Sequence, residues 1–234
     1  MEATKAKAGD AACLFRRISG QTRPVLGAMA AAALLVVGVD MGRSWSWPLE
    51  WRVAPAAFYV LVFWVLLGIP PTEHGIRCKV LPNLRYWFRT AVLIGLVVLL
   101  FCALAIPVLA WAGFRIPLPK TSPTEFWGYW LTYACVDAPV AEEFIYRGVL
   151  CPALACLLGR WAAIFLSGSL FALLHVIGGN PGPDNFIAGY FLAWAFLKSG
   201  SLLVPIAMHS VGNLFAGLIH LLNYSHPNLL NGLL

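Results

Sequence analysis

Long apolar runs, separated by short polar or glycine- and proline-rich segments, divide the chain into seven parts. The runs cover roughly residues 24–42, 55–71, 88–114, 125–159, 161–179, 185–199 and 201–222. Because about 20 apolar residues in a helix cross the hydrocarbon core of a bilayer, most runs have close to the length of one span. The pattern predicts an all-α, polytopic transmembrane helical bundle with about seven spans, or eight if one of the two longest runs is divided.

The composition supports a membrane protein and excludes a water-soluble domain. Of the 234 residues 60% are hydrophobic and 11% are charged, whereas a soluble domain has about 25% charged residues. The net charge of +6 is spread along the chain and forms no basic patch, so we expect membrane lipids as partners and no nucleic acid. The sequence leaves the oligomeric state open.

Four parts follow from this pattern. We expect a basic cytoplasmic tail over residues 1–23, N-terminal spans over 24–124, and a second group of spans over 125–222. A short C-terminal tail over 223–234 completes the chain. The second group contains the residues with the clearest chemical potential.

The distribution of basic residues predicts the orientation, because cytoplasmic loops of membrane proteins are enriched in Lys and Arg. Segments on the side of the N-terminus carry twelve of them. Segments on the opposite side carry four, namely Arg43, Arg52, Arg115 and Lys120. The count predicts an integral membrane protein with a cytoplasmic N-terminus and the C-terminus on the far side. Division of the third or fourth run into two spans would invert the later part of this alternation.

The fourth run, 125–159, is too long for one straight span. Pro139 and Pro152 are two positions at which it can kink. We expect one long, tilted or broken helix with Glu142 near its middle. In the alternative, the span ends near Arg147 and Glu142 lies at the inner edge of the membrane.

Charged residues inside a bilayer are costly, so each one is a candidate for a functional role. Glu143 and Arg147 have the i, i+4 spacing of a helical ion pair. Glu142 points about 100° away around the helix, so it has no local partner and we expect it to lie without a cation. This acid therefore suits a general base.

Later spans add two histidines and an amide. Phe171-x-x-x-His175 and His209-x-x-x-Asn213 each place both residues on one helix face. The chain contains neither Gly-x-Ser-x-Gly nor His-Glu-x-x-His, which are typical of serine hydrolases and of one class of zinc proteases. Two histidines and a glutamate could still bind zinc, but an acid, two imidazoles and an amide can activate water without a metal.

The three motifs together resemble those of the type II CAAX prenyl endopeptidases and their bacterial relatives, the CAAX protease and bacteriocin-processing family of intramembrane proteases. Glu142-Glu143-x-x-x-Arg147 is followed directly by Gly148, and the two histidine motifs come in the same order on later spans. The resemblance covers residues 125–222. It implies a bacterial inner-membrane localisation and a membrane-bound protein or peptide as the substrate.

The resemblance also implies roles for six residues. Glu142 and His175 would activate the attacking water, and His209 and Asn213 would stabilise the oxyanion. Glu143 and Arg147 would order the site. We expect no cofactor and no bound metal.

Two other functional classes remain open at this point. A catalytically silent membrane scaffold or immunity protein of the same family could keep the polar cluster as a structural network. A small proton-coupled transporter would also need buried Glu and His, although the absence of an internal repeat is unfavourable for that class.

Overall fold

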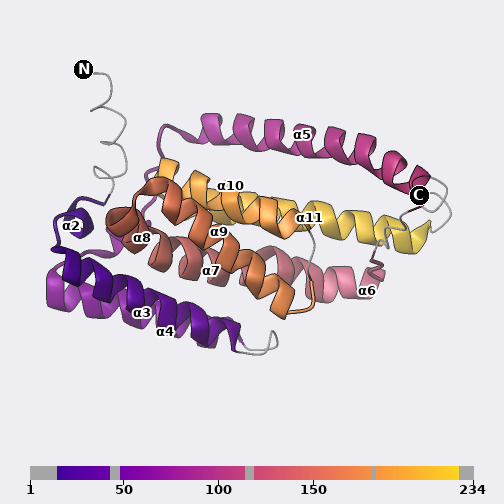
Figure 1. Cartoon of the computed structure of the whole chain (residues 1–234). Helices are drawn as coiled ribbons and strands as arrows, with labels where there is room; N and C mark the ends of the chain where they lie inside the picture. Colours follow the sequence, from indigo (N-terminus) through magenta and orange to yellow (C-terminus); the bar gives the residue numbers. More distant parts are fainter. Residues whose placement is uncertain (1–14, 43–47, 114–118, 181–182, 227–234) are drawn as a thin grey trace, which may run out of the picture. The chain divides into compact units, whose positions relative to one another are not determined.

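The computed structural model describes residues 15–42, 48–113, 119–180 and 183–226, and all the regular secondary structure in them is helical (Figure 1). The prediction of an all-α protein is confirmed for this part of the chain. Here η1 is a 3₁₀ helix, and η2 and η3 are π-helices. The elements are α2 (Arg16–Ser19), α3 (Arg23–Met41), α4 (Leu49–Leu67), η1 (Pro71–His74), α5 (Leu84–Trp111), α6 (Pro123–Glu125), η2 (Phe126–Asp137), α7 (Ala138–Glu143), η3 (Phe144–Leu150), α8 (Cys151–Leu158), α9 (Arg160–Ile177), α10 (Pro183–Ser199) and α11 (Leu203–Ser225).

The helices have the surface of a membrane protein. Among the described residues, α3, α4, α9 and α11 are long and apolar enough to cross a bilayer. Leu35 on α3 and Val65 on α4 are both 73% exposed, which suits contact with lipid chains. Each of the seven apolar runs coincides with a helix or a series of helices, while the number of spans remains a prediction.

The chain folds into two compact units. The first combines Met1–Leu81 with Ala138–Ala207, and the second combines Pro82–Asp137 with Met208–Leu234. In the first unit, α3 and α4 lie side by side (Figure 1), α3 also packs against η3 and α8, and α9 packs against α10. Met29, Tyr59 and Ile145 are among the buried side chains that join these helices into one core.

A short helix precedes α3 in the first unit. Phe15 and Ile18, at the end of the predicted tail, are fully buried. The Glu73 carboxylate of η1 accepts hydrogen bonds from the backbone N–H groups of Arg17 at 2.7 and 2.8 Å and of Ile18 at 2.8 Å, so it caps the first turn of α2. Part of the predicted tail 1–23 is therefore folded. Residues 1–14, and residues 227–234 of the predicted C-terminal tail, lie outside the described residues.

The predicted long helix is present as one continuous element from Pro123 to Leu158, with Glu142 near its middle. Neither Pro139 nor Pro152 breaks it. A π-helix comes before each proline instead, because proline has no N–H for the turn before it. The Gly148 carbonyl, which an α-helix would pair with residue 152, accepts a hydrogen bond from His74 Nδ1 at 2.9 Å.

The second unit contains α5, α6, η2 and the larger part of α11. Within it, the Trp130 indole of η2 donates a hydrogen bond to the Asn213 carbonyl at 2.8 Å. The ring of Trp130 also contacts His220 edge to face, with centroids 5.0 Å apart. These contacts join η2 to α11.

Candidate active site

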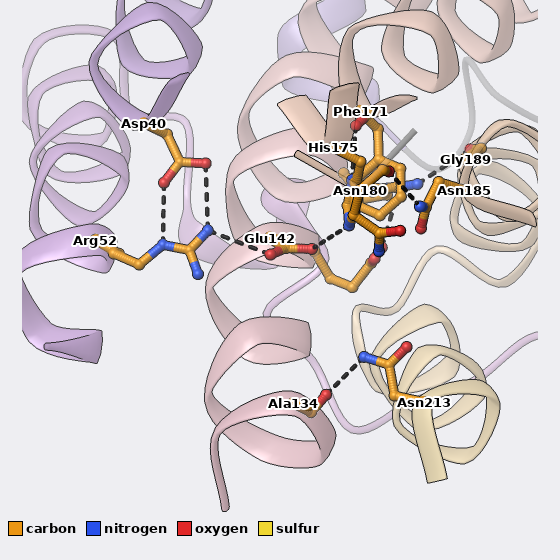
Figure 2. Close-up of polar contacts among 12 residues, drawn as sticks. Asp40, Arg52, Ala134, Glu142, Phe171, His175, Asn180, Asn185, Gly189 and Asn213 are labelled. Carbon is orange, nitrogen blue, oxygen red and sulfur yellow. Dashed lines mark hydrogen bonds and ion pairs between the residues drawn. The ribbon is translucent and has the colours of Figure 1, made fainter. Parts of the chain in front are cut away.

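Glu142 lies at the end of α7, next to the π-helix η3, and is 1% exposed. Its Oε1 atom is 3.3 Å from Arg52 Nη2 of α4. Arg52 Nε is in turn 3.1 Å from Asp40 Oδ1 of α3 (Figure 2). The prediction that Glu142 has no cation nearby is therefore wrong. The helical spacing that supported it describes neighbours along one helix, whereas Arg52 comes from another helix, 90 residues away in sequence.

The second carboxylate oxygen of Glu142 faces His175 of α9. Oε2 is 4.0 Å from His175 Nε2, which is too long for a direct hydrogen bond. His175 Nδ1 is 2.9 Å from the Phe171 carbonyl. Because a carbonyl oxygen only accepts, Nδ1 carries the proton, and in the neutral ring Nε2 presents a lone pair. The Phe171-x-x-x-His175 spacing thus orients the imidazole within its own helix.

The ion pair predicted from the spacing of Glu143 and Arg147 is present. Arg147 Nε is 3.1 Å from Glu143 Oε2, and both side chains are fully buried. Arg147 Nη2 donates a hydrogen bond to the Gly189 carbonyl of α10 at 3.0 Å. The guanidinium carbon also lies 4.5 Å above the centre of the Phe171 ring. Arg147 therefore links η3 to α9 and α10.

Close packing of α9 and α10 brings the Gly189 carbonyl within reach of Arg147. A Cβ atom at Gly189 would lie 2.7 Å from the Gly168 carbonyl oxygen. A Cβ atom at Gly168 would overlap the ring of Tyr190. Only glycine at both positions permits this approach of the two backbones.

His209 and Asn213 belong to the second unit. His209 is 8% exposed, and Asn213 Nδ2 donates a hydrogen bond to the Ala134 carbonyl of η2 at 2.6 Å (Figure 2). In a π-helix that carbonyl would pair with residue 139, which is a proline and has no N–H. The structure thus brings Glu142, Glu143, Arg147 and His175 together in the first unit. The convergence of His209 and Asn213 with Glu142 and His175 remains a prediction.

A metal ion would need more ligands than Glu142 and His175 supply. Within the described ranges, no group of three or more His, Cys, Asp or Glu side chains is placed to hold one.

The sequence pattern did not indicate that Asp40 and Arg52 are site residues. Asp40 lies inside the first apolar run, and Arg52 was counted as a charge flanking the membrane. A useful signal was available, because an acid inside an apolar helix needs a partner to offset its burial. Both residues are only 5% exposed, yet the sequence alone does not show that their common partner is Glu142.

Comparison with known proteins agrees with the three motifs. Residues 123–215 match the family model described as type II CAAX prenyl endopeptidase Rce1-like. No curated protein and no solved structure matches the chain. The matched residues begin at α6 and end within α11, and they exclude Asp40 and Arg52. They include Glu142, Glu143, Arg147, His175, His209 and Asn213. The segment 123–215 thus resembles the Rce1-like type II CAAX prenyl endopeptidases, as its motifs indicate.

Proposed function

We propose that this protein is a glutamate-dependent intramembrane endopeptidase with Glu142 as its general base. One observation carries the proposal. A buried carboxylate oxygen of Glu142 faces the Nε2 atom of His175 at 4.0 Å, inside a segment that matches the model of a protease family. A carboxylate and an imidazole held this way suit the activation of a water molecule.

The geometry suggests how the water would be held. In the neutral tautomer of His175, both Nε2 and the Glu142 oxygen are hydrogen-bond acceptors. These two atoms are 4.0 Å apart, so a water oxygen can lie about 2.8 Å from both and donate one hydrogen to each. Transfer of one proton to Glu142 as the oxygen attacks the peptide carbonyl would produce the tetrahedral intermediate.

His209 and Asn213 are proposed to stabilise the oxyanion of that intermediate. One hydrogen of the Asn213 amide goes to the Ala134 carbonyl, and the second remains available to donate. The bond to Ala134 would hold the amide in position before the substrate arrives. Such preorganisation is what makes an oxyanion donor effective.

The substrate is proposed to be a membrane-bound protein or peptide that is cut near its C-terminus or within its membrane segment. The apolar helices and the family of residues 123–215 make this an integral membrane protein. We place it in the bacterial inner membrane with a cytoplasmic N-terminus.

Two features of the first unit support this orientation. Arg52 and Arg147 are buried and paired, so they do not flank the membrane, and the charge count becomes eleven against three. The loop after α4 also contacts the loop after α10. The Leu202 N–H bonds to the Gly75 carbonyl at 3.0 Å, and the Ser201 hydroxyl donates to the Arg77 carbonyl at 2.7 Å. These contacts support the placement of both loops on one side of the membrane, as the alternation of charges predicts.

A silent scaffold is the second candidate, and the Arg52–Glu142 ion pair favours it. A carboxylate already paired with an arginine can serve as one member of a structural network. In this function Glu142 would stabilise the fold without taking a proton.

The Glu142→Gln variant separates the two functions. If Glu142 is the base, the variant should remain folded in the membrane and lose proteolysis, because glutamine preserves the volume but accepts no proton. The measurement is a proteomic comparison of new peptide termini in membranes that contain wild-type or variant protein, followed by cleavage of an identified peptide by purified protein.

Glu50→Gln is a matched control, since Glu50 is an exposed acid in the first turn of α4. It should keep full activity. Near-normal cleavage by purified Glu142→Gln would remove the proposed function and leave the scaffold.

A further inference from the structure

We propose that Arg52, held in place by Asp40, is a positioning residue that orients the Glu142 carboxylate toward His175. This inference rests on the proposed function, because it assigns Arg52 a task only if Glu142 is the base. Neither Asp40 nor Arg52 lies in the matched segment 123–215. The proposal therefore gives α3 and α4 a part in the reaction that acts through Glu142.

The three side chains come from three helices of the first unit. Asp40 lies near the end of α3, Arg52 in the first turns of α4, and Glu142 at the end of α7. Arg52 Nε is 3.1 Å from Asp40 Oδ1, and Arg52 Nη2 is 3.4 Å from Asp40 Oδ2. The same Nη2 is 3.3 Å from Glu142 Oε1. All three side chains are at most 5% exposed.

The geometry of the guanidinium group explains this division of contacts. Nε and Nη2 lie on one edge of a planar fork, and this edge matches the two oxygens of a carboxylate. Asp40 occupies that edge and so limits rotation of the Arg52 side chain. The second hydrogen of Nη2 is then available for Glu142 Oε1.

The consequence for Glu142 is a fixed carboxylate orientation. With Oε1 bound to Arg52, the other oxygen, Oε2, is the one that faces His175 Nε2. A carboxylate free to rotate about its last bond would present either oxygen in a range of directions. Holding a base within a few tenths of an ångström of its working position is a substantial part of catalysis.

Charge provides a second reason for the arrangement. A buried carboxylate without a cation is costly, and the positive charge of Arg52 offsets that cost. Asp40 and Glu142 share this one guanidinium, so the three groups together carry one negative charge if all are ionised. The cluster thus keeps a charged base in a buried place, which a neutral hydrogen-bond donor would do less well.

The experiment measures kcat and KM for three single variants and one double variant. The substrate is an internally quenched peptide with a farnesylated CAAX C-terminus, or the peptide identified by the proteomic comparison if the first is not cleaved. Arg52→Met should lower kcat by about 10- to 100-fold, the usual cost of losing a partner that orients a reacting group, with KM little changed. Arg52→Lys should recover part of kcat, because it restores the charge but not the fork.

The third variant tests the role of Asp40. Asp40→Asn alone should lower kcat, and Asp40→Asn with Arg52→Met should be no worse than Arg52→Met. This non-additivity is expected if Asp40 acts only through Arg52. If Asp40 and Arg52 instead contributed independently to stability, the effects of the two substitutions would add in the double variant.

Glu73→Gln is the matched structural control. Glu73 is another buried acid of the first unit, and its carboxylate bonds to the backbone of α2. Its loss should lower the melting temperature while kcat per folded molecule stays at the wild-type value. The proposal would be overturned if Glu73→Gln and Arg52→Met have the same melting temperature and show the same fall in kcat.

The remaining outcomes are also decisive. Wild-type kcat in Arg52→Met, with Glu142→Gln inactive, overturns the positioning role and leaves the proposed function intact. Activity in Glu142→Gln overturns the proposed function itself. If Arg52→Met does not fold, the test rests on Arg52→Lys and Asp40→Asn. Wild-type kcat in both variants would overturn the proposal. Failure of both to fold would also overturn it, in favour of a structural role.

Discussion

Replacement of Arg147 by alanine should strongly destabilise the first unit. Arg147 is fully buried and has three contacts, with the Glu143 carboxylate at 3.1 Å, the Gly189 carbonyl at 3.0 Å and the Phe171 ring at 4.5 Å. Removing one member of a buried ion pair costs about 3–5 kcal/mol, because the remaining charge loses its partner. A hydrogen bond from a charged donor contributes about 1.5–3 kcal/mol, and a desolvated cation–π contact about 2 kcal/mol.

These contributions overlap, since all three act through one guanidinium group. We therefore expect a loss of at least about 3–5 kcal/mol of unfolding free energy. The assay is equilibrium unfolding of purified protein in mixed micelles with a denaturing detergent, followed by tryptophan fluorescence. The abundance of the variant in membranes should fall as well.

A double variant tests the electrostatic part of this reasoning. Glu143→Leu with Arg147→Met removes both charges and keeps much of the side-chain volume, and such exchanges of buried pairs are often close to neutral. It should be more stable than Arg147→Ala by about 2 kcal/mol or more. The reasoning would be refuted if Arg147→Ala loses less than about 1 kcal/mol of unfolding free energy, which is the contribution of a solvated ion pair. It would also be refuted if the double variant is no more stable than Arg147→Ala.

The remaining predictions concern packing, pH, the oxyanion donor Asn213 and metal. Gly189→Ala should cost about 1–3 kcal/mol of unfolding free energy, because its Cβ would lie 2.7 Å from the Gly168 carbonyl oxygen. The control is Gly38→Ala, whose Cβ would have no neighbour within 4 Å and which should be neutral or slightly stabilising in the same unfolding assay. Burial lowers the pKa of His74 from its ordinary 6.5, against a smaller opposite effect of its backbone hydrogen bond. The neutral ring therefore stabilises the fold above pH 6.5, and this stability is lost as the pH falls toward the pKa of the folded state. Melting temperatures of His74→Asn should depend less on pH between about 6.5 and 5 than those of the wild type; equal slopes would contradict this. Asn213→Ala should fold and lose about 10²–10³-fold in kcat, and elemental analysis should find no stoichiometric metal. One zinc per chain, removed together with activity by a chelator, would favour a metalloprotease.

The sequence alone was sufficient for features that depend on neighbours along the chain. Apolar runs long enough to cross a bilayer predicted the helices, because the bilayer leaves a span little alternative to a helix. The spacing of Glu143 and Arg147 predicted their ion pair, since residues four apart lie on one helical face. The order of the three motifs predicted the family whose model residues 123–215 match.

The positions of the two prolines did not by themselves predict the local form of the helix. Pro139 and Pro152 mark places where the helix lacks an N–H donor, and we expected kinks there. The chain forms π-helices before both prolines. Side chains distant in sequence take the carbonyls near each proline, as His74 does for Gly148. Which side chain fills such a position depends on packing between helices.

Only the tertiary structure decided what surrounds Glu142. The sequence showed an acid without a nearby cation, and that description is correct along its own helix. Asp40 and Arg52 reach the carboxylate because α3 and α4 form part of the same unit as α7. Ion pairing acts through space over a few ångströms, so residues 90 positions apart can be direct neighbours. Helical periodicity contains no information about such distances, and a single sequence therefore shows which residues are buried charges without showing how they pair.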